Sequence, residues 1–281
     1  MKSTKYFNLI IACLLMQYVG TGCESIESYD QVGIENGVIM NGVFSVSLSK
    51  QVKFSQGNLQ YQASSQTWRL AELQFSQICK GNVQSVHQDW IDLFVMSTST
   101  TNFGTRMSDE ITSWDDYLPD FIDWGTLKLK NSSLNGWRTL TREEWMYLLH
   151  QRDNAEEKLF HATISGVKGH VLLPDNWVCP VDISIVNTYY RNQFDNYDVN
   201  QFSKKEWRKL QANGAVFLPC KEETQEQHYF ERNNQYWTST ITNYPKRPYS
   251  VAFYVYSENY IRSDYENSII SCSVRLVQDI K

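Results

Sequence analysis

Two short segments carry the same helix signature, and they constrain the fold more than any other feature of the chain. One is Thr141-Arg142-Glu143-Glu144-Trp145 and the other is Ser203-Lys204-Lys205-Glu206-Trp207. Each matches a capping box, in which a hydroxyl accepts from the third helical amide and a glutamate three residues on returns to the cap amide. A tryptophan follows at once. The sequence therefore predicts two helices, each packed on a sheet through its tryptophan.

The residues that follow each signature complete these two helices. Leu148 and Leu149 fall on the face of Trp145, and Leu210 falls on the side of Trp207. Asn213-Gly214 is a stop signal, because glycine readily takes the left-handed conformation that ends a helix. We expect both helices to be structural rather than catalytic.

Segments with the alternation of β-strands surround the two helices. Period-two runs broken by Ser49-Lys50 and Gln56-Gly57-Asn58 indicate antiparallel strands joined by tight turns. Further strand-like runs follow each helix and recur in the last third of the chain. The runs are residues 43–48, 52–54, 59–61, 67–73, 169–174, 214–219, 235–240, 250–256 and 273–277. The chain is therefore expected to be an α+β domain.

The N-terminal segment predicts export with lipid attachment. Lys2 and Lys5 precede an apolar run, residues 6–19, which is shorter than the ~20 residues that span a bilayer. Gly20-Thr21-Gly22-Cys23 then resembles a bacterial lipobox, whose cysteine receives diacylglycerol and becomes the first mature residue, although such boxes usually carry leucine where Gly20 stands. An ordinary secretory signal is the alternative. Lipidation of Cys23 would place the protein at the outer membrane or the cell surface.

Three parts are expected along the chain. Residues 1–22 are a lipoprotein signal peptide, residues 23–42 a flexible tether and residues 43–281 a single domain. The tether is predicted because Glu24, Glu27 and their neighbours are polar, with few large apolar residues. The 259 residues left after the signal peptide are ample for a buried core, so no cofactor is required.

Charge and composition favour recognition of something other than nucleic acid. The chain has 26 basic and 31 acidic residues, and loss of Lys2 and Lys5 leaves 24 against 31, a balance that repels phosphate backbones. Aromatic residues are 14% of the chain, with 17 Tyr and 9 Trp. These side chains give stiff contact area in binding surfaces, and a core rich in aromatic rings is the alternative.

The spacing of cysteines and histidines predicts no metal site. Four cysteines follow Cys23, and in an exported protein they permit two disulfides, with free buried thiols as the alternative. No CxxC, HxxxH or HExxH spacing occurs. The acidic group Trp114-Asp115-Asp116-Tyr117, with Asp120 and Asp123, is the better cation candidate, and a solvated acidic loop is its default interpretation. The four cysteines are Cys79, Cys179, Cys220 and Cys272.

Seven motifs, in this order, resemble secreted bacterial surface-lipoprotein domains with a C-type-lectin-like fold, which are related to the formylglycine-generating and sulfatase-modifying proteins. They span residues 43–278. The motifs are Phe54-Ser55-Gln56-Gly57-Asn58-Leu59-Gln60-Tyr61, Trp90-Ile91-Asp92-Leu93-Phe94, Trp137-Arg138-Thr139-Leu140-Thr141, Leu172-Leu173-Pro174-Asp175-Asn176-Trp177, Asn213-Gly214-Ala215-Val216-Phe217-Leu218-Pro219, Tyr236-Trp237-Thr238-Ser239-Thr240 and Ser273-Val274-Arg275-Leu276-Val277.

This resemblance implies two helices flanking a twisted antiparallel sheet, with long loops that carry whatever binds. Many such proteins are lipoproteins or adhesin-like surface proteins. The chain departs from the family at Val95-Met96-Ser97-Thr98 and at Cys220-Lys221-Glu222-Glu223. Both segments fall in expected loops, so ligand specificity does not carry over.

Catalytic and calcium-binding signatures of the related proteins are missing from the sequence. Formylglycine-generating proteins bind copper through two cysteines close together near the C-terminus, whereas Cys272 has no second cysteine within ten residues. The Glu-Pro-Asn and Gln-Pro-Asp motifs of calcium-dependent lectins do not occur. An oxygen-dependent or hydrolytic enzyme on this scaffold, and a structural subunit of a surface assembly, remain the alternatives to a non-catalytic binding protein.

The predicted recognition face lies near the C-terminus. Tyrosines alternate there with arginines and small polar residues, a composition typical of binding loops, and packing between loops is the alternative role for these rings. The hypothesis places the face on loops at 241–249 and 257–270, with a tryptophan beneath them, and its ligand is a protein or a glycan. The candidate residues are Trp237, Tyr244, Arg247, Tyr249, Tyr260, Arg262 and Tyr265.

Overall fold

The computed structural model describes ten stretches of the chain: residues 31–78, 90–97, 100–105, 121–133, 135–188, 196–220, 234–244, 247–255, 261–266 and 272–281. Between residues 234 and 266, side chains are described for 236–240. The described part is an α+β fold made mostly of small sheets, with two short α-helices, as the sequence predicts.

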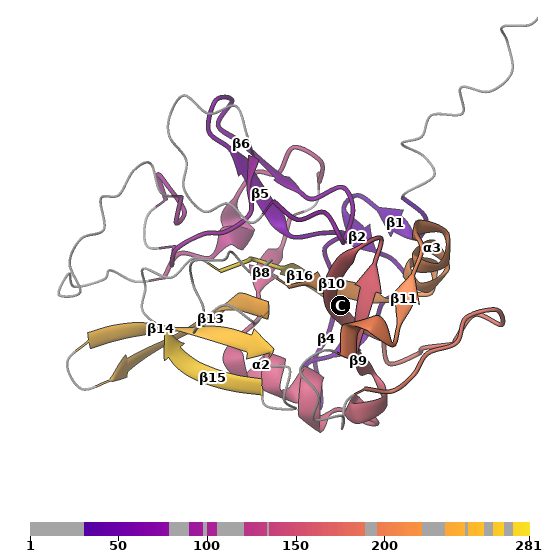
Figure 1. Ribbon diagram of the computed structural model, residues 1–281. Coiled ribbons are helices and arrows are strands. Elements are labelled where there is room, and N and C mark those ends of the chain that lie inside the picture. Colours follow the sequence, from indigo (N-terminus) through magenta and orange to yellow (C-terminus); the bar gives the residue numbers. More distant parts are fainter. Residues whose placement is uncertain are drawn as a thin grey trace, which may run out of the picture.

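Most of the sheets are antiparallel, and most of the strands are short (Figure 1). The strands are β1 (Ile34–Glu35), β2 (Val38–Ile39), β3 (Phe44–Ser45), β4 (Gln51–Phe54), β5 (Leu59–Gln62), β6 (Thr67–Leu70), β7 (Trp90–Ile91), β8 (Trp137–Thr139), β9 (Leu159–Ile164), β10 (Val167–Leu172), β11 (Gln201–Phe202), β12 (Val216–Pro219), β13 (Asn234–Tyr244), β14 (Arg247–Val255), β15 (Ile261–Glu266) and β16 (Leu276–Asp279). They form sheets in the orders β1-β2, β3-β4-β16-β8, β6-β5-β7, β11-β9-β10-β12 and β13-β14-β15.

Both helices begin with the capping box that the sequence predicts. The α-helices are α2 (Arg142–Met146), which the π-helical turn η2 (Tyr147–Gln151) continues, and α3 (Lys204–Ala212); the 3-10 turns are η1 (Trp124–Thr126), η3 (Ala155–Glu157) and η4 (Asn196–Asp198). At α2, Thr141 Oγ1 accepts from the Glu144 amide, and Glu144 accepts from the Thr141 amide. Ser203 and Glu206 repeat the arrangement at α3.

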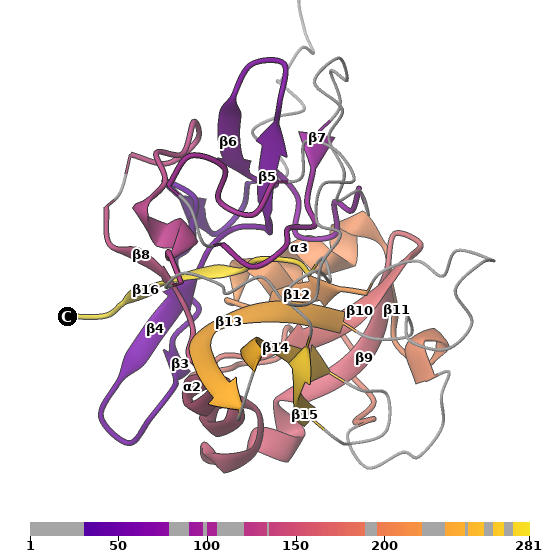
Figure 2. The ribbon, with the colours of Figure 1, turned by 90° about the vertical axis from the view of Figure 1, so that its left-hand side faces the viewer.

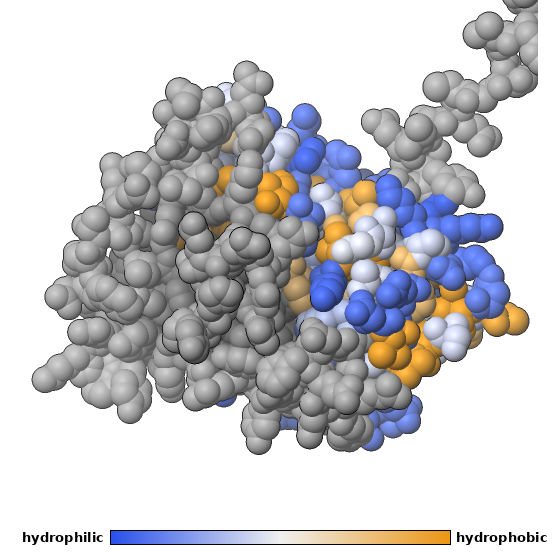
Figure 3. Space-filling model, in the orientation of Figure 1, coloured by the Kyte–Doolittle hydropathy of each residue, from blue (hydrophilic) through white to orange (hydrophobic). Residues whose placement is uncertain are grey.

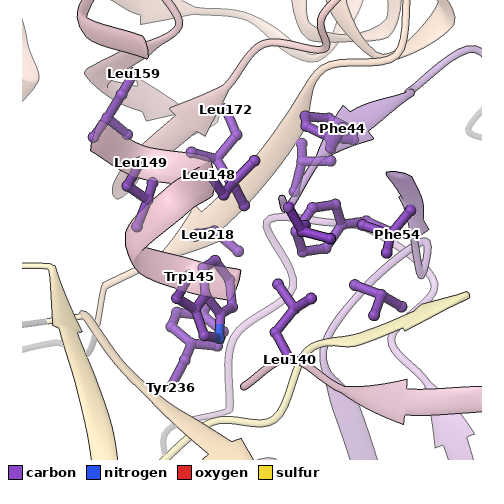
Figure 4. Close-up of a cluster of buried hydrophobic side chains, with 14 of the residues drawn as sticks. Phe44, Phe54, Leu140, Trp145, Leu148, Leu149, Leu159, Leu172, Leu218 and Tyr236 are labelled. Carbon is purple, nitrogen blue, oxygen red and sulfur yellow. The ribbon is translucent and has the colours of Figure 1, made fainter. Parts of the chain in front are cut away.

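The apolar face of α2 and η2 packs into a core cluster between two sheets. Trp145, Leu148 and Leu149 are buried in the same cluster as Phe54 and Leu218 (Figure 4). The ring centroids of Trp145 and Phe54 lie 5.9 Å apart. This contact confirms the prediction that the helix packs on a sheet through its tryptophan.

The second helix packs in the same way on the other large sheet. Trp207 is 1% exposed, and its ring centroid lies 5.7 Å from that of Phe217 on β12. The helix ends at Asn213 and Gly214, as predicted, and Gly214 has φ +91°. A Cβ on Gly214 would lie 2.5 Å from the carbonyl oxygen of Asn41, so glycine is also required by the close approach of the N-terminal segment.

The last strand lies in the interior of its sheet. β16 pairs with β4 on one side and β8 on the other, and its Leu276 and Val277 are fully buried. In Figure 2 it crosses the molecule beside β8 and above β13. Strands from the two ends of the described chain thus share one sheet.

The folded part begins earlier than the predicted boundary at residue 43. Residues 34–39 form the β1–β2 hairpin, and Val38 and Ile39 are buried at 3% and 0% exposure. The amide of Gln56 donates to the carbonyl of Gly37. The expected tether therefore extends at most to residue 30, because the segment after it is part of the domain.

Candidate functional site

The predicted recognition residues fall on strands rather than on loops. Tyr244 ends β13, and Arg247 and Tyr249 begin β14, with Tyr244 paired to Arg247 in the backbone register. Arg262 and Tyr265 lie on β15, opposite Tyr254 and Val251 of β14. The expectation of loops at 241–249 and 257–270 is thus wrong for the described residues in these ranges, because strand pairing continues through them. Tyr260 lies outside the described residues, as does Cys23.

Trp237 holds this sheet to the rest of the molecule. Its side chain is 1% exposed and its Nε1 donates to the carbonyl of Phe94 at 2.6 Å. Its backbone amide donates to the carbonyl of Ser273 at 3.0 Å. Trp237 is therefore part of the core beneath the candidate face and makes no contact with solvent that a ligand could replace.

The next residues of β13 attach the sheet to α2. The amide of Ser239 donates to the carbonyl of Leu140 at 3.0 Å. Thr240 Oγ1 accepts from the amide of Arg142 at 2.9 Å, at the first turn of α2. One end of the sheet β13–β15 is consequently tied to the core, and the sheet lies on the opposite side of the molecule from α3 (Figure 1).

A second candidate site, which the sequence analysis did not find, is a buried pair of histidines. His161 on β9 and His170 on β10 are register partners, and their ring centroids lie 4.5 Å apart. They are 5% and 1% exposed. Burial lowers the pKa of His161 to about 4. Burial, and then the neighbouring His161, lower the pKa of His170 well below its usual value. Both imidazoles are therefore neutral at pH 7.

Polar groups from three other segments surround this pair. Thr188 Oγ1 accepts from the His161 amide at 2.8 Å and lies 3.0 Å from Nδ1 of the same residue. The rings of Tyr197 and His161 meet edge-on, with their centroids 5.0 Å apart. Cys220 Sγ donates to the Tyr197 hydroxyl at 3.1 Å. A hydroxyl that accepts from an amide can also donate its own proton, so Thr188 can serve as the donor to Nδ1 of the neutral His161 ring. The sequence offers a weak signal for the pair, since each histidine stands inside an apolar strand-like run.

A buried arginine lies in a polar cluster on the other side of β12. Arg275 is 1% exposed and donates to Asn58 Oδ1 at 3.3 Å and to Gln74 Oε1 at 2.8 Å. Asn58 Nδ2 in turn donates to the Tyr236 hydroxyl at 3.2 Å. Burial lowers the pKa of Arg275 to about 10, which still leaves it charged at pH 7. These amide contacts connect the segments before β5 and after β6 with β13 and with the segment before β16, a role in holding the sheets together.

The cysteines and carboxylates that the sequence offered for disulfides or for a cation form no such site where they are described. Cys179 is exposed, Cys220 and Cys272 are buried, and none of the three forms a disulfide. Cys79 and the acidic residues 114–120 lie outside the described part. Asp123 caps η1, accepting from the Gly125 amide, and also accepts from Thr139. Within the described stretches, no three histidine, cysteine or carboxylate side chains are grouped to hold a metal ion.

Among the described residues, no helix has the length and apolar character needed to cross a bilayer. Comparison of the chain with protein-family models, with curated proteins and with solved structures found no match to any of them.

Proposed function

We propose that the protein is a non-catalytic, lipid-anchored surface protein that binds a protein or a glycan through the sheet β13–β15. The domain is proposed to be C-type-lectin-like, as the order of the seven motifs suggests. The lipid is proposed to attach at Cys23, and the protein to be displayed at the outer membrane or the cell surface.

One observation carries the binding proposal: the tyrosine- and arginine-rich segment is a sheet with a rigid root. Tyr236 and Trp237 are buried at 0% and 1% exposure, and the backbone on either side is bonded to Ser273 and Leu140. After Trp237, β13 continues for seven residues to Tyr244. A preformed sheet supports recognition, because a ligand need not order it and the entropic cost of binding is lower than for flexible loops.

The buried histidine pair supports a structural role over a catalytic one. General acid–base catalysis is most efficient when the pKa of the group lies near the working pH. The pKa of His161 is about 4, and that of His170 is well below its usual value. Each ring is also almost fully buried. Among the described residues, this histidine pair therefore gives little support to the alternative that the protein is an enzyme.

The experiment compares the purified full-length protein with a variant that carries Tyr244→Ser, Tyr249→Ser and Tyr265→Ser. Both are applied to arrays of glycans and of extracellular proteins. We expect the triple variant to lose at least about tenfold in affinity for the ligand found, since clustered tyrosines dominate such interfaces. Tyr147→Ser, a partly buried tyrosine of η2, is the matched control. Unchanged binding by a triple variant with a wild-type melting temperature would reject this face.

A further inference from the structure

The described chain enters the domain at the C-terminal end of α3. Gln211 Nε2 donates to the carbonyl of Val32 at 3.0 Å. Gly33 lies against Ala212, so closely that a Cβ on this glycine would come within 3.0 Å of the Ala212 Cα. In Figure 1, β1 and α3 are neighbours on the same side of the molecule. The N-terminal segment and α3 therefore lie on a common side of the domain.

Few residues separate the proposed lipid site from the point where the described chain begins on this side. Cys23 stands eight residues before Gln31, where the described chain begins. Eight residues span at most about 28 Å when fully extended. A diacylglycerol on Cys23 would consequently keep the α3 side of the domain within about 3 nm of the bilayer surface.

The outward face of α3 is basic, although the chain as a whole is acidic. Lys204 and Lys205 are exposed, and Arg208 and Lys209 are partly exposed, whereas Trp207 points into the core. Glu206 on the helix and Asp182 beside it are the acidic groups of this surface, so four positive and two negative charges leave a net charge of +2. The formal net charge of the chain is −5.

An apolar loop lies next to this basic face. Val178 and Val181 are 70% and 106% exposed. The loop is held in place from within, because the partly buried Trp177 and Ile183 pack on the core cluster that contains Trp207. An ion pair between Asp182 and Lys209 joins it to α3. In Figure 3, apolar and hydrophilic atoms lie side by side on the right of the molecule, the side on which Figure 1 places α3.

We propose that this surface, formed by the outward face of α3 with Val178 and Val181, rests on an anionic phospholipid bilayer. Basic residues are attracted to the negative surface of an anionic membrane, and exposed aliphatic side chains insert among the headgroups. Two observations favour a membrane as the partner of this surface. The segment that leads to the lipid site joins the domain on this same side, and the positive charge of the surface is opposite to the net charge of the chain. The inference rests on the proposed lipid anchor. It adds an orientation, in which the sheet β13–β15 faces away from the bilayer.

Cys179 is exposed and lies between Val178 and Val181 in the sequence, so a label on it reports directly on this surface. The full-length lipidated protein with Cys79→Ser is labelled at Cys179 with an environment-sensitive fluorophore and reconstituted in phosphatidylcholine vesicles with or without phosphatidylglycerol. Labelling is selective because Cys220 and Cys272 are buried. We expect headgroup nitroxide lipids to quench this probe at least about twofold more in phosphatidylglycerol vesicles, and high salt to reverse the effect.

Two variants and one alternative label make the test specific. Lys204→Glu with Lys205→Glu should abolish the extra quenching, and it leaves folding intact because acidic residues are favourable in the first turn of a helix. Lys128→Glu with Lys130→Glu, two exposed lysines of another segment, should not change it. A label on Leu48→Cys, in the β3–β4 turn, with Cys79 and Cys179 replaced by serine, should not be quenched.

The possible failures separate this inference from the proposed anchor. A protein that does not remain with the vesicles at all contradicts the lipid anchor. A protein that remains with them but shows equal quenching at Cys179 and at Leu48→Cys overturns the membrane-facing surface alone. If the fluorescence of the Cys179 probe without vesicles instead changed with protein concentration, as when the probe becomes covered, this surface would be assigned to contact with a second copy of the chain. That result would also overturn the proposal.

Discussion

His161 and His170 occupy paired positions on β9 and β10, where burial keeps both imidazoles neutral. Each side chain is polar, yet each is almost fully buried. The neighbouring Phe160 and Val171 point to the opposite face of the sheet, where they pack in the core cluster with Trp207. At the scale of single residues, the stability of the fold depends on these two rings staying unprotonated.

Acid should therefore destabilise the protein through this pair. The pKa of His161 is about 4 in the folded chain and 6.5 without burial, so the unfolded chain binds more protons between these values. The contribution of the neutral His161 ring to the free energy of unfolding is expected to be fully present above about pH 6.5. It should fall by about 3 kcal/mol as the pH drops to about 4. Chemical denaturation from pH 7 to pH 4 measures this dependence.

Two variants isolate the contribution of the pair from that of the carboxylates. His161→Asn should flatten the pH dependence, because its amide does not titrate in this range. His150→Asn, at a less buried position of η2, is expected to change it much less. If His161→Asn left the slope as steep as in the wild type, protonation of this ring would not be the cause.

The two helices share a capping design but differ in what their capping glutamates contact. Glu144 is 7% exposed and also accepts from both terminal nitrogens of Arg138, at 2.6 and 2.9 Å. Arg138 in turn bonds Asp279, so the cap of α2 is connected to β8 and β16. Glu206 at α3 is solvated and bonds Ser203. At the scale of elements, the α2 cap belongs to the sheet as well as to its helix.

This difference predicts unequal effects of one substitution. Glu144→Gln should cost on the order of 2 kcal/mol, because it removes a charge that a partly buried arginine pairs with. Glu206→Gln should cost less than about 1 kcal/mol, since it weakens an exposed cap alone. Urea denaturation of the two variants at pH 7 gives both values. Equal losses would show that the contacts of Arg138 add nothing to the stability of the α2 cap.

At the scale of the whole molecule, β16 joins segments that are far apart in sequence. It lies between β4 and β8, and the amide of Ser55 donates to the carbonyl of Leu276 at 2.9 Å. Pairing between residues near position 54 and residues near position 277 closes a long loop, which slows folding and makes it cooperative.

Removal of the last strand should consequently unfold the domain. A chain that stops before Leu276 leaves β4 and β8 without their shared partner and exposes the core around Phe54 and Tyr236. We expect loss of the cooperative thermal transition and rapid digestion by trypsin. Deletion of Lys281, an exposed residue beyond β16, is the control and should leave the transition unchanged. A truncated chain that still melts cooperatively would contradict this account.

Local signals predicted local structure well. The capping residues, the glycine stop of α3 and the strand-like runs of β4, β5 and β10 are properties of neighbouring residues, and the structure confirms them. The same alternation predicted strands at 235–240 and 250–256, but the tyrosines and arginines after them suggested loops. Side-chain composition does not report backbone hydrogen bonding, so the continuation of β13 and β14 and the whole of β15 were missed.

What the sequence determined by itself is the two helices and part of the set of strands, since capping and periodicity act over a few residues and need no partner from elsewhere. Tertiary structure alone decided which elements meet: that Val38 and Ile39 belong to the core, that Trp237 bonds the carbonyl of Phe94, and that His161 and His170 are neighbours. These outcomes depend on the pairing of distant strands. Such pairing is selected by the total burial of many side chains, which no short segment encodes.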